Sequence, residues 1–462
     1  VFLDLVRHAA AGVGAKLVGA FGDLERMPED RADLPQVRQD DLCYLQFSSG
    51  STRSPTGVAV THRALLANAR GIVRDALKLR EGDRCTSWLP FYHDMGLVGF
   101  LLVPLTSQVS TDYLSPDGFA RRPLIWPTLI SRNGGTLSYS PSFGYDLCAR
   151  RAMNADLGHL DLSRWRGAGI GGDVIRPGIL SRFADTFRGC GFRKEAFVAS
   201  YGMAEATLGI SFAPLDRGME VDRVDLARLR REGRATPADG DNVRELVLCG
   251  ELLPGHELEI RGADGTVLQE REVGRIMVRG PSVMTEYFGR REETARVLSS
   301  DGWLDTGDLG YLVGKSLVVA GRSKDLILVN GRNVWPEDLE LAVEHQIEGV
   351  RQGDVVAFSV DEQEAERVVL LVQCRTSDAA AREALRSAAA EAVLARAGLN
   401  CTVVLVSHNA LPRTSSGKLS RMRARAMYLD SILGEQQPHV ASASFGSDSA
   451  APAPKIQMPQ SS

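Results

Sequence analysis

The chain has 462 residues, enough for two or three domains, and its 44% hydrophobic and 24% charged residues are typical of a soluble globular protein. Its formal net charge of -4 gives no electrostatic reason to expect a nucleic-acid partner. The longest apolar run, at 97–105, is too short to span a bilayer, and residues 1–22 show no secretory signal.

The seven cysteines are scattered along the chain and form no CxxC pair. Such usage is typical of free thiols in a reducing compartment, so we expect a cytoplasmic protein without a cysteine-based metal cluster. The chain opens with Val1 inside an apolar stretch, from which we expect the first part of a domain to be missing.

The first predicted elements flank a loop of small polar residues. Apolar runs at 42–47 and 57–61 predict two strands, and helical spacing predicts a helix over 62–79 with Thr61 as its N-cap. This succession indicates an α/β domain. The intervening loop, 48–57, lacks the GxxxxGK spacing of Walker loops. Its hydroxyls and glycine amides could surround a phosphate, although a polar surface turn would look similar.

In the middle of the chain, a strand predicted at 197–200 leads into Tyr201-Gly202-Met203-Ala204-Glu205. The ring of Tyr201 could stack on a base and the carboxylate of Glu205 could hold Mg²⁺, although such residues are more often structural. The charged residues 214–245 predict an exposed insertion, and 246–279 are β-like with glycine turns.

Two further segments offer polar groups for a sugar. Asp308 lies between Gly307 and Gly310 in a predicted tight turn, where its carboxylate could accept hydrogen bonds from a ribose diol. Arg322, in the following 321–325 segment, could add a second contact. An ordinary β-turn and a charged linker are the structural alternatives.

Beyond a boundary near 321–325, predicted strands at 326–329, 355–360 and 368–374 and helices at 336–345 and 379–397 indicate a compact α+β unit. A hydroxyl-rich loop then carries Lys418. A lone lysine in a loop is usually solvated, but one that reaches both an α-phosphate and a carboxylate would be a strong electrostatic catalyst.

Taken in this order, these segments resemble the adenylate-forming superfamily of acyl-, aryl- and aminoacyl-activating enzymes, from about Gln39 to Arg425. Segments 45–52, 88–97, 140–148 and 331–333 are most similar to the fatty acyl-AMP ligases. The sequence from Ser51 to Val58 follows the STRxPxGV pattern of that branch rather than the GTTGxPK of acyl-CoA ligases.

The resemblance implies an α/β protein with a large N-terminal domain over 1–322, layered α/β with a β-rich subdomain and incomplete at its start. A small mobile α+β lid domain over 323–432 and a disordered tail over 433–462 would follow. Residues 214–245 resemble an extra segment that is linked in the family to poor use of coenzyme A.

The implied reaction uses ATP and Mg²⁺ to convert a fatty acid into acyl-AMP with release of pyrophosphate. The acyl group would then pass to the phosphopantetheine of an acyl carrier protein, or of a carrier domain in a polyketide or nonribosomal peptide synthase. The alternatives are a fatty acyl-CoA ligase and a non-catalytic remnant that binds a nucleotide or acyl-adenylate.

The resemblance also assigns roles to individual residues. Catalytic roles fall on Lys418, Glu205 and His93, magnesium binding on Glu205 and Thr52, a hinge on Lys324, and the wall of an acyl pocket on Phe143, Gly144 and Met203. Nucleotide binding is implied for Ser48, Ser49, Gly50, Ser51, Thr52, Gly57, Gly171, Gly172, Asp173, Tyr201, Gly202, Met203, Asp308 and Arg322.

Overall fold

The computed structural model describes residues 4, 7, 10, 11, 23, 35–48, 56–329, 332–362, 365–414 and 417–435. The chain divides into two compact units, Val1–Asp41 and Leu42–Ser462. In the first unit Asp4, Arg7 and Ala10 are helical, and Arg7 pairs with Asp4 at 3.7 Å. All elements described below belong to the second unit.

The second unit opens with the predicted strand, strand and helix. β1 (Leu42–Ser48) pairs antiparallel with β2 (Thr56–Thr61), and α3 (His62–Arg70) follows at once. The Thr61 hydroxyl accepts a hydrogen bond from the Ala64 amide at 3.2 Å, which confirms the predicted N-cap. The predicted helix differs in its second half, because it continues beyond Arg70 as a π-helix, Gly71–Ala76.

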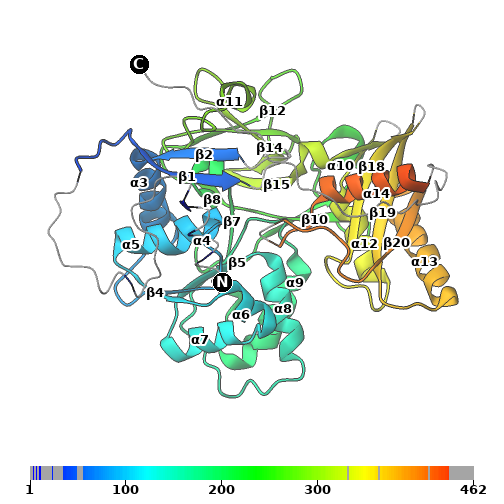
Figure 1. Ribbon diagram of the computed structural model, residues 1–462, viewed down its shortest axis with the longest axis horizontal. Coiled ribbons are helices and arrows are strands. Elements are labelled where there is room, and N and C mark those ends of the chain that lie inside the picture. Colours follow the sequence, from blue (N-terminus) through cyan, green and yellow to red (C-terminus); the bar gives the residue numbers. More distant parts are fainter. Residues whose placement is uncertain are drawn as a thin grey trace, which may run out of the picture. The chain divides into compact units, whose positions relative to one another are not determined.

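The main sheet has seven strands in the order β11-β8-β7-β6-β5-β3-β4 (Figure 1). The neighbours from β4 to β7 are parallel, whereas β8 is antiparallel to β7 and β11 is antiparallel to β8. Ligands bind at the carboxyl ends of such parallel strands. The strands are β3 (Arg84–Ser87), β4 (Ser110–Tyr113), β5 (Leu137–Ser140), β6 (Gly167–Ile170), β7 (Phe197–Gly202), β8 (Gly209–Phe212) and β11 (Glu251–Leu252).

Helices follow these strands and supply a large apolar core. Its centre is an aromatic cluster in which Trp126 lies 5.2 Å from the rings of both Tyr145 and Trp165, and Phe183 lies 4.9 Å from Tyr145. Such edge-to-face pairs stabilise beyond the area that they bury. The helices are α4 (Asp94–Leu97), a π-helix (Val98–Leu102), α5 (Val103–Ser107), α6 (Pro116–Arg121), α7 (Ile125–Asn133), α8 (Ser142–Ala152) and α9 (Pro177–Phe187).

A four-stranded antiparallel sheet forms the β-rich part, in the order β12 (Glu257–Arg261), β13 (Gly274–Arg279), β14 (Leu304–Val313) and β15 (Ser316–Arg322). Helix α11 (Arg291–Val297) precedes β14. Asp308 lies inside β14 and pairs with Arg322 of β15, so the predicted tight turn is wrong. The two flanking glycines instead belong to a bulged strand, in which Gly307 adopts a φ of 71° and the register with β13 shifts.

Residues 214–245 contain β9 (Val221–Asp225), α10 (Leu226–Glu232) and the first part of β10 (Val243–Val247). The expectation that this segment is exposed is wrong for one side of it, where Val224, Leu229 and Arg244 are buried. The charged composition was misleading because Arg230 and Arg244 both pair with Asp338 of the C-terminal region.

The C-terminal region has its own three-stranded sheet, in the order β18 (Val355–Glu362), β19 (Ala365–Cys374) and β20 (Cys401–Ser407). The helices α12 (Pro336–Gln346) and α13 (Ala379–Ala397) pack on one face, and α14 (Arg421–Glu435) covers the other (Figure 1). This confirms the predicted α+β region. A small hairpin of β16 (Ile327–Val329) and β17 (Arg332–Val334) precedes α12. No helix among the described residues is long and apolar enough to cross a membrane.

Candidate active site

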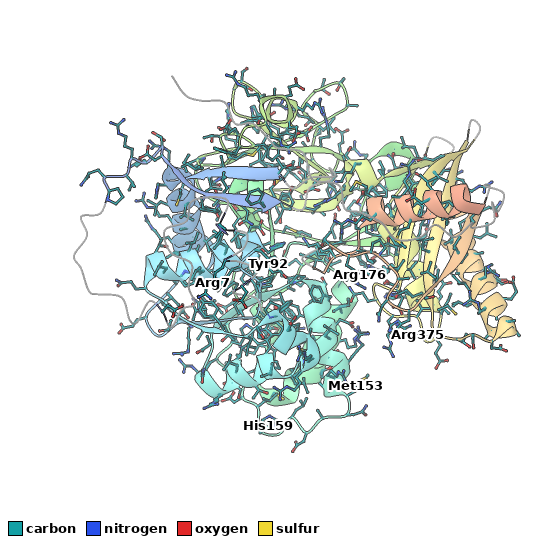
Figure 2. The ribbon with its side chains drawn as sticks, in the orientation of Figure 1. Arg7, Tyr92, Met153, His159, Arg176 and Arg375 are labelled. Carbon is teal, nitrogen blue, oxygen red and sulfur yellow. The ribbon has the colours of Figure 1, made fainter. Side chains whose placement is uncertain are left out.

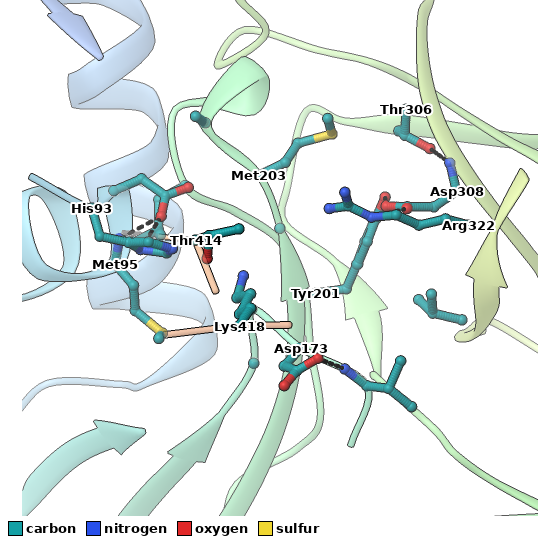
Figure 3. Close-up of a pocket in the computed structure, with 18 of the residues that line it drawn as sticks. His93, Met95, Asp173, Tyr201, Met203, Thr306, Asp308, Arg322, Thr414 and Lys418 are labelled. Atoms are coloured by element: carbon teal, nitrogen blue, oxygen red, sulfur yellow. Dashed lines mark hydrogen bonds and ion pairs between the residues drawn. The ribbon is translucent and has the colours of Figure 1, made fainter. Parts of the chain in front are cut away.

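A cavity of about 1880 Å³ lies at the carboxyl ends of the parallel strands. Segments that follow β3, β5, β6 and β7 line it, together with β14, β15 and the loop before α14. Figure 3 shows side chains from these distant parts of the sequence converging on one space. The fold therefore assembles most of the described site residues that the sequence suggested.

One end of the cavity holds three linked polar side chains. The Tyr201 hydroxyl donates a hydrogen bond to Asp308 Oδ2 at 2.7 Å, and Arg322 Nε lies 3.5 Å from Asp308 Oδ1 (Figure 3). Burial raises the pKa of Asp308, and the positive charge of Arg322 opposes this shift. A carboxylate held in this way can accept hydrogen bonds from a sugar hydroxyl.

The turn after β6 forms another edge of the cavity. Gly171, Gly172 and Asp173 all line it, and Asp173 Oδ1 accepts a hydrogen bond from the Val174 amide at 2.8 Å. Gly172 has a φ of 74°, and a Cβ added there would stand 3.8 Å from Lys418 Nζ. Glycine therefore suits the left-handed backbone of this turn, and the lysine amine lies beside it.

The loop of Lys418 enters the cavity as a tight hairpin. Arg413 and Leu419 form a β-bridge, the Thr414 amide donates to the Lys418 carbonyl at 2.8 Å, and Gly417 turns the chain with a φ of 84°. Figure 3 shows the lysine amine between the histidine side and the tyrosine side of the site. An amine in this position can neutralise negative charge that develops in the cavity.

Two carboxylates lie on the histidine side. His93 Nδ1 lies 2.6 Å from Asp94 Oδ1. Burial raises the pKa of Asp94, but His93 and the charge of Lys418 outweigh it and hold that pKa below its usual value. Glu205 Oε1 accepts a hydrogen bond from the Tyr287 hydroxyl at 2.8 Å, and burial nevertheless raises the Glu205 pKa.

The remaining predicted residues are not all brought together. Phe143, Gly202, Met203 and Lys324 line the cavity, and Lys324 lies in the short helix Ser323–Asp325, where burial lowers its pKa. Among the described residues, Gly57 and Gly144 stand back from the cavity wall. A Cβ on Gly57 would face the Phe47 ring, and one on Gly144 would collide with Ser140 and Trp88.

The predicted phosphate loop is described only at its edges. Ser48 is the last residue of β1, and Ser49, Gly50, Ser51 and Thr52 lie outside the described residues. Thr56, at the start of β2, lines the cavity. Described residues on both sides of this segment, Phe47 and Thr56, therefore line the cavity.

Sequence reasoning missed several polar residues of this cavity. Asp94 follows His93 directly, so the sequence could have indicated it as a site residue. Tyr287 lies in a segment without any recognisable motif. Arg421, just after the lysine loop, pairs with Asp325 at 3.3 Å and with Glu337 and Glu340 at 3.0 and 2.9 Å. Partners so distant along the chain cannot be inferred from spacing.

Comparisons with known proteins agree with this arrangement. The model of the family of AMP-binding enzymes matches residues 9–288. A putative acyl-CoA synthetase of Caulobacter vibrioides is 52% identical over 435 residues, covering 94% of this chain and 76% of the relative. The medium-chain-fatty-acid–[acyl-carrier-protein] ligase JamA of Moorena producens is 33% identical over 420 residues, covering 88% and 71%.

A solved structure from a study of fatty acyl-adenylate ligases of E. coli and L. pneumophila superposes with a TM-score of 0.87 at 44% identity. The match covers 94% of this chain and 78% of that one. The chain therefore belongs to the AMP-binding enzyme family, within the fatty acyl-AMP ligase branch of the adenylate-forming superfamily.

Proposed function

We propose that the protein joins a fatty acid to the α-phosphate of ATP and then passes the acyl group to the phosphopantetheine thiol of a carrier protein, with release of AMP. A fatty acid carboxylate oxygen attacks the α-phosphorus, the bond from that phosphorus to the bridging oxygen breaks, and pyrophosphate leaves. Chemistry of this kind depends mainly on positioning and on neutralising phosphate charge.

The observation that carries the proposal is the position of Lys418. Its amine enters the same cavity as the Tyr201–Asp308–Arg322 group and lies close to the turn at Gly172. From this position it can bridge an α-phosphate oxygen and the incoming carboxylate. The role of Asp308 and Arg322 would be to hold the ribose, and that of Tyr201 to lie against the adenine.

The residues present fit a magnesium ion that is shared with the nucleotide. Mg²⁺ prefers oxygen ligands and commonly uses one or two carboxylates plus substrate phosphates. Glu205 provides such a carboxylate in the cavity, and Thr52 would be a second protein ligand. Because the described residues hold no group of three His, Cys, Asp or Glu side chains able to bind a metal, phosphate oxygens would complete the coordination. When bound, the ion supplies positive charge to the phosphates.

His93 and the apolar walls would position the fatty acid. His93 is the N-cap of α4 and lines the cavity together with Phe143 and Met203. The hydrogen bond to Asp94 orients its ring. Lys324, beside Arg322, would serve as the hinge about which the small domain over 323–432 turns between the two half-reactions.

The carrier-protein step is supported by the similarity to the ligase JamA, whose name specifies an acyl carrier protein. The Caulobacter relative, named as a putative acyl-CoA synthetase, supports the alternative acceptor, coenzyme A. The deciding experiment incubates the protein with ATP, mixed fatty acids and either coenzyme A or a phosphopantetheinylated carrier protein. Mass spectrometry should detect acyl-AMP in all samples and acyl thioester with the carrier only. Rapid acyl-CoA formation would favour the alternative, and absence of acyl-AMP would reject the proposal.

A further inference from the structure

One part of the cavity wall is apolar and extends away from the reaction centre. Its lining includes Ile72, Leu79, Cys85, Gly99, Phe100 and Val103, none of which is charged. The continuous helical segment from α4 through the π-helix Val98–Leu102 to α5 has His93 immediately before its first residue. Ten residues of helix cover roughly 15 Å, so Pro104, also in the lining, lies far from the histidine end.

Two π-helices shape this apolar part. Ile72 lies in Gly71–Ala76, while Gly99 and Phe100 lie in Val98–Leu102. π-helical turns are rare and are frequent at functional sites. Gly99 contributes no side chain, and a Cβ placed there would meet Leu208 Cδ2 at 3.2 Å as its one neighbour within 4 Å. A larger residue at 99 would therefore project into the cavity.

A second cavity, of about 650 Å³, lies behind the apolar part. Leu79 is the one described residue that lines both cavities. The wall between the two cavities is thin elsewhere as well. Cys85 lines the first cavity, and its neighbour Arg84 lines the second. Similarly, Pro104 lines the first cavity and accepts a hydrogen bond at 2.9 Å from the amide of Val109, which lines the second.

The backbone holds Leu79 firmly at this partition. Its amide donates to the Val73 carbonyl at 2.8 Å, and the preceding Lys78 adopts a φ of 44°. A left-handed conformation at a non-glycine residue is sparsely populated and persists only where the surroundings enforce it. The side chain of Leu79 is half-buried, as expected for a residue between an interior space and an outer one.

We propose that Leu79 is the end wall of the acyl channel and limits the length of the fatty acid, and that Gly99 keeps the channel open along its course. This inference rests on the proposed function, because it assigns the apolar part of the cavity to the alkyl chain. Shortening Leu79 to Ala would join the two cavities. Adding a side chain at Gly99 would close the channel before its end.

The test measures acyl-AMP formed from an equimolar mixture of saturated fatty acids of increasing length. One methylene in an apolar pocket changes specificity by roughly 10-fold or more. Leu79→Ala should therefore raise the ratio of longer to shorter products by about 10-fold, and Gly99→Leu should lower it by a similar factor. Retention of each variant's fold is checked by circular dichroism and thermal unfolding.

Matched controls make the same chemical changes away from the channel. Leu105→Ala removes an exposed leucine of α5, and Gly178→Leu adds a side chain where a Cβ would have no neighbour within 4 Å. Both should keep the wild-type profile.

An unchanged profile in Leu79→Ala and Gly99→Leu would overturn the proposal while wild-type acyl-AMP formation upholds the proposed function. If Leu79→Ala fails to fold, Gly99→Leu alone decides. No acyl-AMP from any acid in the wild type would overturn the proposed function, and this inference with it.

Discussion

The pKa values of three carboxyl groups in the active site depend on the side chains beside them. Arg322 opposes the protonation of Asp308, Tyr287 opposes that of Glu205, and His93 with Lys418 keeps Asp94 ionised. Burial raises the pKa of all three carboxyl groups, and only for Asp94 do the neighbours outweigh it. A bound cation would therefore favour the ionised forms of Asp308 and Glu205, as His93 and Lys418 already do for Asp94.

Removal of the Lys418 amine should suppress the first half-reaction. Loss of one preorganised charge typically lowers a rate by roughly 10²–10³, or about 3–4 kcal/mol. We expect this loss for Lys418→Ala in ATP–pyrophosphate exchange, with unchanged thermal unfolding. Lys315→Ala, at the exposed turn between β14 and β15, is the matched control and should exchange at the wild-type rate. Normal exchange in Lys418→Ala would exclude the assigned role.

The raised pKa of Glu205 should appear in the pH dependence of adenylation. Its carboxylate must be ionised to bind a cation, so activity should fall as the pH drops through this raised pKa, above the range of an ordinary glutamate. The Tyr287 hydroxyl stabilises the ionised form. Tyr287→Phe should therefore move the acid limb of the pH–rate profile to still higher pH. A shift towards lower pH would contradict this account.

At the scale of elements, the parallel strands of the main sheet determine where the site residues lie. β6 and β7 end directly before Gly171 and Met203, and β5 ends three residues before Phe143, so one edge of the sheet supplies all three. The segment that carries Leu79 is held by hydrogen bonds from a residue at the amino end of β6. Arg166, just before β6, donates to the carbonyls of Leu77 and Lys78 at 3.0 and 3.3 Å.

The same arginine forms a buried ion pair that we expect to be important for stability. Arg166 Nε donates to Asp83 Oδ1 at 2.9 Å, and the Asp83 side chain is 1% exposed. Asp83→Ala would leave the buried arginine without its carboxylate, which typically costs about 3–5 kcal/mol. Urea denaturation should show this loss at neutral pH.

The effect of Asp83→Ala should depend on pH with a defined sign. Burial raises the pKa of Asp83. Its carboxylate also accepts hydrogen bonds from the side chains of Arg166 and Thr136 and from the Arg80 backbone amide, and these lower the pKa by more. The pKa of Asp83 in the folded protein therefore lies below the usual value. The stabilisation is thus present above the unfolded pKa and is lost as the pH falls through the folded one. Wild type and variant should converge in acid, and a difference that widened in acid would contradict the assignment.

At the scale of the whole second unit, buried ion pairs join the C-terminal region to the rest. Arg176, which is labelled in Figure 2, lies just before α9 and pairs with Glu344 of α12. Arg244 Nε lies 2.7 Å from Asp338 Oδ1, and its guanidinium stands 4.6 Å from the centre of the Trp335 ring. These contacts hold the C-terminal region in the orientation that brings Lys418 into the cavity.

Loss of Asp338 should release this orientation. Asp338→Ala would leave Arg230 and Arg244 buried without their carboxylate, at a cost of about 3–5 kcal/mol. We expect slower ATP–pyrophosphate exchange and faster proteolysis at 322–325. Asp185→Ala, which breaks an exposed pair with Arg188, should change neither measurement. Unchanged proteolysis and exchange in Asp338→Ala would show that this pair does not hold the region.

The sequence predicted the parts of the fold and site that depend on local order. Thr61 as a cap, the strands of the C-terminal region and the helix ending at Gly398 all follow from short patterns. The bulge at Asp308 and the buried side of 214–245 do not, because they depend on partners such as Arg322 and Asp338 that lie far along the chain. The apolar part of the cavity wall that contains Ile72, Leu79 and Phe100 was not predicted for the same reason.

The π-helix Val98–Leu102 gives the enzyme a simple route to altered substrate range. Each residue of an α-helix advances the direction of its side chain by about 100°. A π-turn holds about one residue more than an α-turn, so a gene that lost one codon here would restore ordinary helical winding, remove one side chain from this stretch of the cavity wall and leave Val103 and Pro104 facing nearly as before. Relatives that differ in length here, rather than in composition, are thus expected to handle different fatty acids.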